Sequence, residues 1–470
     1  MPQPFSFRNR LNIILKRSDG MFRNRWRTVP KLLAVSLIAA QIAAVPLTAA
    51  ADSPVVSLRN PSAAVPTPVL KPAWSAAVDS ANKWEDATEQ QAAAANGKVF
   101  AFSGKKLIAI DATTGKKLWQ FGEQLIPKVV YDKGVLYGIT KNGALYAATE
   151  KGGKKWSEKA SLADADKLML IGDTLYITRG TDLFAYNAET GKLRWKANEK
   201  QADGGDPNVI EANGVVLRVY MVQGALTSSQ LTAYDKKTGK QLWAHFRQGA
   251  PLAIQDGLVY SITDEFSFNN GDSPDRQIKI TSYNLKSGVV KGERVYKWTV
   301  PQSPDGSFRS GGIDGSAFLN GNDLYIYQGP VIAKYAFNSY SASAAPKPVK
   351  TWNKSYQSDQ YMPLYKIHRD RMLFQSFNNG QMLAGMKLAN GQTVGWYGDN
   401  PAAQIDVYGN GVYIGQTDGV FHGVNFDTQK QVFQVKTGSR AYGPTLVTGG
   451  QVIIQAEGKL IGVKLPTALQ

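Results

Sequence analysis

The sequence LIAIDATTGKKLWQF, residues 107–121, contains the pattern that decides the fold. Residues 107–112 alternate apolar and small side chains with a period of two, which is typical of a β-strand with one buried face. The following turn ends at Gly115, a residue that adopts a positive φ without steric cost. Residues 116–121 then resume as a second strand, with Trp119 as its large apolar side chain. The stretch therefore predicts a β-hairpin.

Copies of this hairpin recur along the chain at intervals of 37 to 55 residues. Close copies lie at residues 183–197 and 231–245, and a looser one lies at residues 145–157. The aromatic residues that we interpret as blade anchors are Trp119, Trp156, Trp195, Trp243, Trp298, Trp352, Trp396 and Phe433. A strand-rich repeat of this period indicates a β-propeller, an all-β ring of four-stranded antiparallel blades.

Each repeat also has an upstream hairpin with its own turn signal, such as Asn96-Gly97. Counting these hairpins predicts a single propeller of nine units, with eight as the alternative. Residues 72–78 resemble the last strand of a repeat without its partner, and residues 459–464 resemble the strand that it lacks. We therefore expect the N-terminal strand to pair with the C-terminal sheet and close the ring, which leaves no exposed sheet edge at the junction.

The composition limits the chemistry that the chain can perform. The 470 residues include no cysteine, which excludes disulfides, thiolate metal sites, a cysteine nucleophile and a lipid-modified cysteine. The formal net charge is +17, and residues 1–51 contribute +7 of it, so about +10 remains for the rest of the chain. A basic body favours anionic partners without identifying one.

The N-terminal region is predicted to be a targeting segment. Residues 1–51 combine a basic flank, an apolar run and the sequence Ala49-Ala50-Ala51, as in a secretory signal peptide, and the true start could be Met21. An uncleaved anchor helix is the alternative. Residues 52–69 are rich in proline and serine and indicate a linker, and residues 70–470 form the predicted propeller.

The pattern LxAxDxxTGKxLW resembles the repeat of the PQQ-binding-like, or quinoprotein-type, β-propellers. The two ends of the propeller region further resemble those of the outer-membrane assembly lipoprotein of this superfamily. The resemblance implies the propeller fold over about residues 70–466. It does not select a function, because the superfamily includes dehydrogenases, assembly scaffolds and sensor ectodomains.

An enzyme in this superfamily would be a quinone-dependent dehydrogenase. The resemblance implies that such enzymes need bound PQQ, a Ca²⁺ held by carboxylate and amide oxygens, and an aspartate base. No stretch of this chain aligns with their cofactor site, so we predict no catalytic residue, cofactor or metal. His245, His368 and His422 are isolated and lack a zinc-binding spacing. The acidic insertion at residues 264–276 matches no calcium loop, and we interpret it as a solvated loop.

Blade topology assigns the connections to two faces. Connections between the second and third strands and between blades emerge on one face, which we call the crossover face. The longest loops lie there and carry aromatic residues and an arginine, as interaction surfaces often do. The candidate partner-binding residues are Phe266, Phe268, Phe308, Arg309, Tyr356 and Tyr361. The alternative is that these aromatic residues cover the edges of the ring itself.

The opposite face, which we call the hairpin face, holds turns rich in lysine. The candidate basic rim consists of Lys116, Lys117, Lys154, Lys155, Lys192, Arg194, Lys236, Lys237 and Lys240. Such a rim could attract an anionic wall polymer or membrane surface. Ordinary solvated lysines are the alternative.

We interpret the chain as an exported, non-catalytic binding or scaffold module that is secreted or held in the cell envelope. We expect a monomer, an envelope protein or anionic wall polymer as partner, no transmembrane anchor in the mature chain and no nucleic acid. A quinone-dependent dehydrogenase and a scaffold like the outer-membrane protein assembly factor remain as alternatives.

Overall fold

The computed structural model describes residues 66–79, 91–223, 227–265, 273–308, 314–353, 361–376, 382–396 and 398–470. The chain divides into two units, Met1–Ala64 and Val65–Gln470. The predicted signal peptide lies outside the described residues, which all belong to the second unit.

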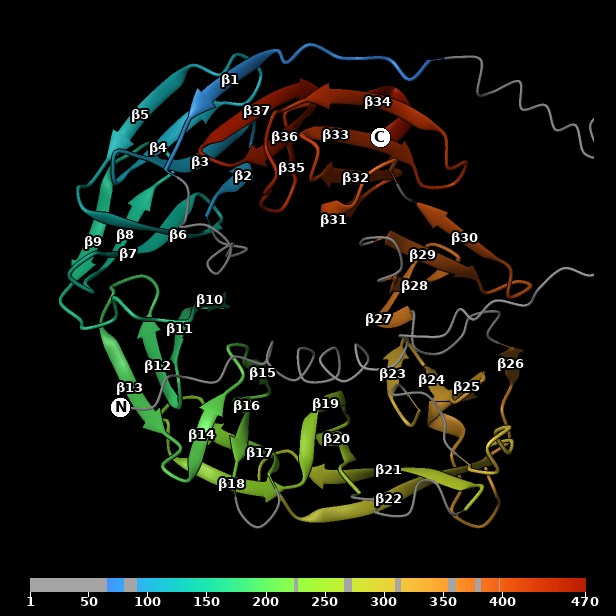
Figure 1. Ribbon diagram of the computed structural model, residues 1–470. Helices are drawn as coiled ribbons and strands as arrows, with labels where there is room; N and C mark the ends of the chain where they lie inside the picture. Colours follow the sequence, from blue (N-terminus) through green and yellow to red (C-terminus); the bar gives the residue numbers. More distant parts are fainter. Residues whose placement is uncertain are drawn as a thin grey trace, which may run out of the picture. The chain divides into compact units, whose positions relative to one another are not determined.

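The second unit is a nine-bladed all-β propeller, which confirms the predicted fold and the count of nine (Figure 1). Each blade is an antiparallel sheet whose first strand faces the centre of the ring and whose last strand lies at the outer rim (Figure 1).

Blades 1 to 3 have four strands each. Blade 1 consists of β2 (Ala93–Ala95), β3 (Lys98–Ser103), β4 (Lys106–Asp111) and β5 (Lys117–Phe121). Blade 2 consists of β6 (Leu125–Asp132), β7 (Val135–Thr140), β8 (Leu145–Thr149) and β9 (Lys154–Glu158). Blade 3 consists of β10 (Lys167–Ile171), β11 (Thr174–Arg179), β12 (Asp182–Asn187) and β13 (Leu193–Asn198).

Blade 4 differs from its neighbours because its inner strand is split in two. Blade 4 consists of β14 (Ala202–Gly205), β15 (Ile210–Ala212), β16 (Val215–Val222), β17 (Ser228–Asp235) and β18 (Gln241–Phe246). Blade 5 consists of β19 (Gln248–Gln255), β20 (Leu258–Thr263), β21 (Asp275–Asn284) and β22 (Val290–Thr299). Blade 6 consists of β23 (Ala317–Asn320), β24 (Asp323–Gln328), β25 (Val331–Ala336), the 3₁₀ turn η2 (Phe337–Ser339) and β26 (Lys350–Asn353).

The last three blades include the closure of the ring. Blade 7 consists of β27 (Tyr361–His368), β28 (Arg371–Ser376), β29 (Met382–Lys387) and β30 (Thr393–Trp396). Blade 8 consists of β31 (Ala402–Tyr408), β32 (Gly411–Gln416), β33 (Val420–Asn425) and β34 (Gln431–Lys436). Blade 9 consists of β35 (Leu446–Thr448), β36 (Gln451–Ala456), β37 (Lys459–Lys464), the 3₁₀ turn η3 (Thr467–Leu469) and β1 (Trp74–Ala77).

The N-terminal strand closes the ring as predicted. β1 pairs with β37, with Trp74 opposite Gly462 and Ala76 opposite Leu460. The two chain ends therefore share one sheet, although nearly four hundred residues separate the strands.

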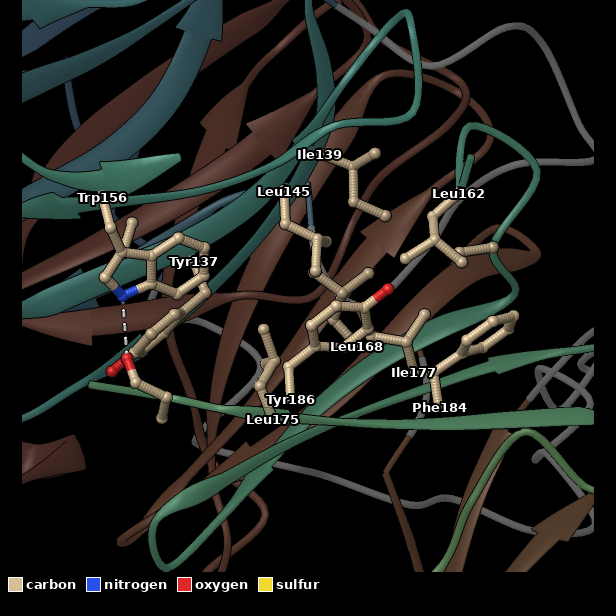
Figure 2. Close-up of a cluster of buried hydrophobic side chains, with 13 residues drawn as sticks. Tyr137, Ile139, Leu145, Trp156, Leu162, Leu168, Leu175, Ile177, Phe184 and Tyr186 are labelled. Carbon is tan, nitrogen blue, oxygen red and sulfur yellow. Dashed lines mark hydrogen bonds between the residues drawn. The ribbon is translucent and has the colours of Figure 1, made fainter. Parts of the chain in front are cut away.

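The hydrophobic core is distributed between the blades. Among the described residues, nine clusters of buried apolar side chains lie one at each of the nine interfaces between neighbouring blades. Figure 2 shows the cluster between blades 2 and 3, where Tyr137 and Leu145 of one blade face Leu175 and Tyr186 of the next. Burial between successive sheets therefore stabilises the ring as a whole.

The repeated turn that precedes each outer strand has a direct physical explanation. The Asp111 carboxylate accepts hydrogen bonds from the backbone N–H groups of Thr113 and Thr114 and from the Thr114 hydroxyl. These bonds, led by that of the hydroxyl, hold the pKa of Asp111 below its ordinary value. Gly115 follows with a φ of +72°. This Asx turn explains why the close copies of the repeat have aspartate or asparagine, then threonine or serine, then glycine.

Tryptophan joins seven of the nine blades to the next through a hydrogen bond of its indole. The Trp156 indole donates its N–H to the carbonyl oxygen of Ala188 in the turn of blade 3, and Figure 2 shows this bond as a dashed line. Among the described residues, seven tryptophans make this bond at 2.7 to 3.1 Å: Trp74, Trp119, Trp156, Trp195, Trp243, Trp352 and Trp396. The interpretation as blade anchors is confirmed for the six of these that the repeat predicted, and Trp74 is a seventh.

Trp298 is a partial exception. This residue packs against the cluster between blades 5 and 6, but its indole nitrogen is buried without a hydrogen bond. The β21–β22 hairpin is unusually long, so Trp298 lies opposite Arg276, beyond the register position of the other anchors. Arg294 takes its place, because its guanidinium donates to the Phe337 carbonyl oxygen at 2.6 Å and covers the Phe337 ring at 4.0 Å.

Candidate functional site

The two predicted faces are confirmed by hydrogen bonds between the turns. On the hairpin face, the N–H of Ala112 donates to the carbonyl oxygen of Gly97 at 2.8 Å. The turn between β4 and β5 therefore meets the turn between β2 and β3. On the crossover face, the N–H of Leu125 donates to the carbonyl oxygen of Lys105 at 2.9 Å. The long loops of the crossover face and the lysine turns therefore belong to opposite sides of the ring.

Arg276 connects two long loops of the crossover face. It lies near the start of β21, and its guanidinium is only 9% exposed. It donates to the carbonyl oxygen of Ser273 in the loop before β21, and to that of Phe308 in the loop between blades 5 and 6. Its Nε lies 3.5 Å from the buried carboxylate of Asp314, at the end of the second loop. One guanidinium therefore fixes both loops to the same blade.

Sequence reasoning missed the role of Arg276. The residue closes the insertion at 264–276, but its partners Phe308 and Asp314 are more than thirty residues away and form no motif with it. Removing one member of a buried charge pair generally leaves the other unpaired at a cost of about 3–5 kcal/mol. The contact thus holds Phe308 and Asp314 beside the start of β21.

Two carboxylates of the acidic insertion form side-chain bonds. Asp264 accepts a hydrogen bond from the Ser228 hydroxyl at 2.7 Å, and Glu265 pairs with Lys279 at 2.8 Å. Burial opposes ionisation of Glu265, yet the bonds from Lys279 and Gln277 hold its pKa below the ordinary value. Within the described residues, no three His, Asp or Glu side chains gather closely enough to hold a metal ion.

Two of the six candidate partner-binding residues can be placed. Phe308 is half-buried, with its carbonyl bound by Arg276. Tyr361 begins β27 and packs, half-buried, against the cluster between blades 6 and 7. Phe266, Phe268, Arg309 and Tyr356 lie outside the described residues. Their role in partner binding stays a prediction.

The candidate basic rim divides into paired and exposed side chains. Lys155, Arg194 and Lys236 each lie 2.6 Å from a carboxylate, those of Glu189, Asp173 and Glu211 respectively. The Arg194 hydrogen bond in turn keeps the pKa of Asp173 far below its usual range. The exposed members are Lys116, Lys117, Lys154, Lys192, Lys237 and Lys240. Only this second group presents uncompensated charge toward a ligand.

The three histidines have structural partners. His245 bonds to the Gly288 carbonyl oxygen at 2.8 Å and stacks on Tyr283. His368 bonds to a backbone carbonyl oxygen at 2.9 Å. His422 is buried in blade 8, where its Nε2 lies 2.7 Å from the side-chain oxygen of Gln416. These surroundings agree with structural roles for all three.

The repeat and its blade geometry match a known family. The family model described as "Outer membrane protein assembly factor BamB" matches residues 71–158 and 156–394, more than half of the chain. This chain belongs to that PQQ-like propeller family. The family's match covers blades 1 to 6 and most of blade 7, together with the closing strand β1.

Individual relatives of this BamB-like propeller are distant. The chain is 26% identical over 225 residues to "Alcohol dehydrogenase (quinone), dehydrogenase subunit" of Acetobacter aceti, a match over 40% of this chain and 28% of that protein. It is 26% identical over 213 residues to "Outer membrane protein assembly factor BamB" of Moranella endobia, over 40% of this chain and 54% of that protein. The chain thus matches about half, or less, of the length of these relatives.

A solved structure is similar in outline. The crystal structure of BamB from Moraxella catarrhalis aligns with a TM-score of 0.45 at 14% sequence identity, over 71% of this chain and 92% of that one. In the described part of this BamB-like chain, no helix is both long and apolar enough to cross a membrane.

The quinone-dependent dehydrogenase alternative requires side chains that can bind Ca²⁺. A calcium-bound quinone site would need several oxygen ligands, carboxylates among them, gathered in one place. The described residues contain no cluster of three or more acidic or histidine side chains, and the chain has no cysteine for the vicinal pair found in many of the dehydrogenases.

Proposed function

We propose that this BamB-like propeller is an extracytoplasmic, non-catalytic binding or scaffold module of the cell envelope, which presents its crossover-face loops to a protein or glycan partner. The observation that carries the proposal is the Arg276 contact, because one buried guanidinium fixes two long loops of that face. Rigid presentation of irregular loops lowers the entropy that binding must overcome. The family and the name of the Moranella endobia relative support a role in outer-membrane protein assembly as one form of this function.

The test is capture of partners from native envelope by the immobilised chain without its predicted signal peptide. We expect the variant with alanine at positions 308, 309, 356 and 361 to lose most of the capture. Arg276→Met should reduce it as well, because the loop that contains Phe308 is then released. Unchanged capture by both folded variants would reject the crossover face.

The basic rim is a second, independent part of the proposal. Binding to an anionic wall polymer should fall when Lys116, Lys117, Lys237 and Lys240 are changed to glutamine, and it should weaken with salt. Lys155→Gln is the matched control, since Lys155 is already paired with Glu189. Affinity that is the same at low and high salt would eliminate the electrostatic interaction.

The dehydrogenase alternative is supported by the similarity to the Acetobacter aceti subunit. It predicts dye reduction when the chain is supplied with PQQ, Ca²⁺ and an alcohol. Such activity would replace the scaffold proposal.

A further inference from the structure

The chain adds a strand of its own to the outer edge of blade 8. The N–H of Gln434 in β34 donates to the carbonyl oxygen of Pro68, and the N–H of Leu70 donates to the carbonyl oxygen of Gln434, both at 2.9 Å. Val69 is thereby bridged in parallel to Gln434, and in Figure 1 the chain before β1 runs along the rim beside β34. Leu70 and Val432 pack against the same cluster. An outer strand of this propeller can therefore accept an extended, parallel peptide.

The outer edge of blade 4 is apolar and has no such cover. β18 ends its sheet, and no described strand pairs with its free edge. Its sequence, QLWAHF, has no Lys, Arg, Asp or Glu. Leu242 and Phe246 lie on one face of the strand together with Ala244, and they are 38% and 46% exposed. The outer strands of blades 1, 2, 3, 5 and 6, by contrast, each contain lysine, which discourages strand addition. β34 has a lysine only at its last residue, beyond the paired Gln434, and the four-residue β30 also lacks charge.

Ala244 is the counterpart of Gln434. Each residue follows the anchoring aromatic of its outer strand, and these aromatics, Trp243 and Phe433, occupy the same register beside the third strand. In an antiparallel ladder, alternate residues direct both backbone polar groups to the same side. The N–H and carbonyl groups of Ala244 therefore point to the free edge, as those of Gln434 point to residues 68–70.

The positive charge beside the free edge of β18 favours extended peptides with acidic residues. The turn that precedes β18 contains the exposed side chains of Lys237 and Lys240. In parallel pairing, peptide residues upstream of the one opposite Ala244 run toward this turn. Acidic residues three to five positions upstream would consequently lie beside the two lysines.

We propose that the free edge of β18 binds an extended segment of a partner protein, which adds as a parallel strand and carries Asp or Glu residues three to five positions before a pair of apolar residues. This surface is separate from the crossover-face loops. Backbone hydrogen bonds would supply affinity, and Leu242, Phe246 and the two lysines would supply specificity.

The absence of cysteine makes the pairing directly testable. The probe is the synthetic peptide Asp-Glu-Asp-Thr-Pro-Cys-Leu, which copies residues 67–70 with cysteine in place of Val69 and adds three acidic residues before them. The peptide is supplied as its mixed disulfide with 2-mercaptoethanol, so that the protein thiolate attacks the peptide sulfur and displaces mercaptoethanol. We expect Ala244→Cys to form at least ten times more protein–peptide disulfide than Ser157→Cys. Ser157 has the same register position in β9, whose edge carries two lysines. Reaction with hydroxyethyl disulfide corrects each variant for thiol exposure.

Further variants separate binding from misfolding. Leu242→Asp with Phe246→Asp, in the Ala244→Cys background, should lower the yield at least tenfold while the thermal midpoint stays within a few degrees, since both side chains are exposed. A peptide with three lysines in place of the acidic residues should react at least fivefold less. Equal yields at the two cysteines, or from the two peptides, would overturn the proposal. So would a concentration-dependent dimer abolished by the double aspartate variant, because a second copy would then be the occupant.

Discussion

The indole nitrogen of Trp74 lies 2.8 Å from the carbonyl oxygen of Ala112, and this hydrogen bond joins the last blade to the first. The Trp74 ring also covers Gly115, where an added Cβ would lie 2.5 Å from its Cγ atom. Asp79 of the same segment extends the closure, because its carboxylate accepts hydrogen bonds from the N–H groups of Gly104 and Lys105 in blade 1. The N-terminal segment therefore binds blades 8, 9 and 1 in succession.

Trp74→Ala should lower the free energy of unfolding by about 3–5 kcal/mol, as for other buried tryptophans. Trp74→Phe keeps most of the ring but loses the bond to Ala112, so its cost should be about 1–2 kcal/mol. Urea unfolding followed by circular dichroism measures both. A phenylalanine variant as unstable as the alanine variant would show that the hydrogen bond matters more than the packing.

Gly115→Ala should be more damaging than the same change at Gly97. Both residues have a φ of +72°, so the backbone strain is shared. A Cβ at Gly97 meets no atom within 4 Å, whereas one at Gly115 collides with Trp74. We expect an extra cost of about 1–3 kcal/mol at Gly115, the usual range for overpacking. Equal thermal shifts for the two variants would contradict the contact.

Arg294→Met should destabilise the chain by about 1–3 kcal/mol, because it removes the charged donor to the Phe337 carbonyl oxygen. Lys297→Met, at an exposed position of the same strand, is the control and should stay within about 0.5 kcal/mol. Trp298→Phe should also cost little for its lost N–H, since the indole nitrogen has no partner. A larger loss for Trp298→Phe than for Arg294→Met would restore Trp298 as the anchor of blade 5.

His422 should make stability depend on pH. Burial lowers the pKa of this imidazole below its ordinary value of about 6.5, against the opposing charge of Asp399. The unfolded chain then binds the proton more readily than the folded chain. The contribution of neutral His422 to the free energy of unfolding is therefore fully present above pH 6.5. It is lost as the pH falls from there toward the lowered pKa, and the free energy of unfolding then drops by at most about 1.4 kcal/mol per pH unit. In His422→Gln, urea midpoints between pH 7 and pH 5 should show a shallower decline than in the parent chain.

Much of the fold could be predicted because the repeat encodes local chemistry. The Asx turn of Asp111, the positive φ of Gly115 and the alternation of each strand act within a few residues of one another. The complementary strands at residues 74–77 and 459–464 could be matched because each lacked the other half of one pattern. The missing indole hydrogen bond of Trp298 could not be predicted, since a tryptophan near the expected spacing carries no sign of a longer hairpin.

The candidate site was less predictable. The crossover face followed from topology, but the contact of Arg276 with Phe308 and Asp314 joins side chains from separate loops. The division of the basic rim into paired and exposed lysines likewise depends on carboxylates of neighbouring blades, such as Glu189 beside Lys155. Composition does not encode such distances.

The sequence by itself determined the blade and the closure of the ring and favoured nine blades over eight, because short-range turn chemistry and a repeated pattern specify them. Only the tertiary structure decided which polar groups meet, which strand edges stay open and where Arg294 replaces a tryptophan. These features arise between blades, where residues distant in the chain come together and burial makes each unpaired polar group costly.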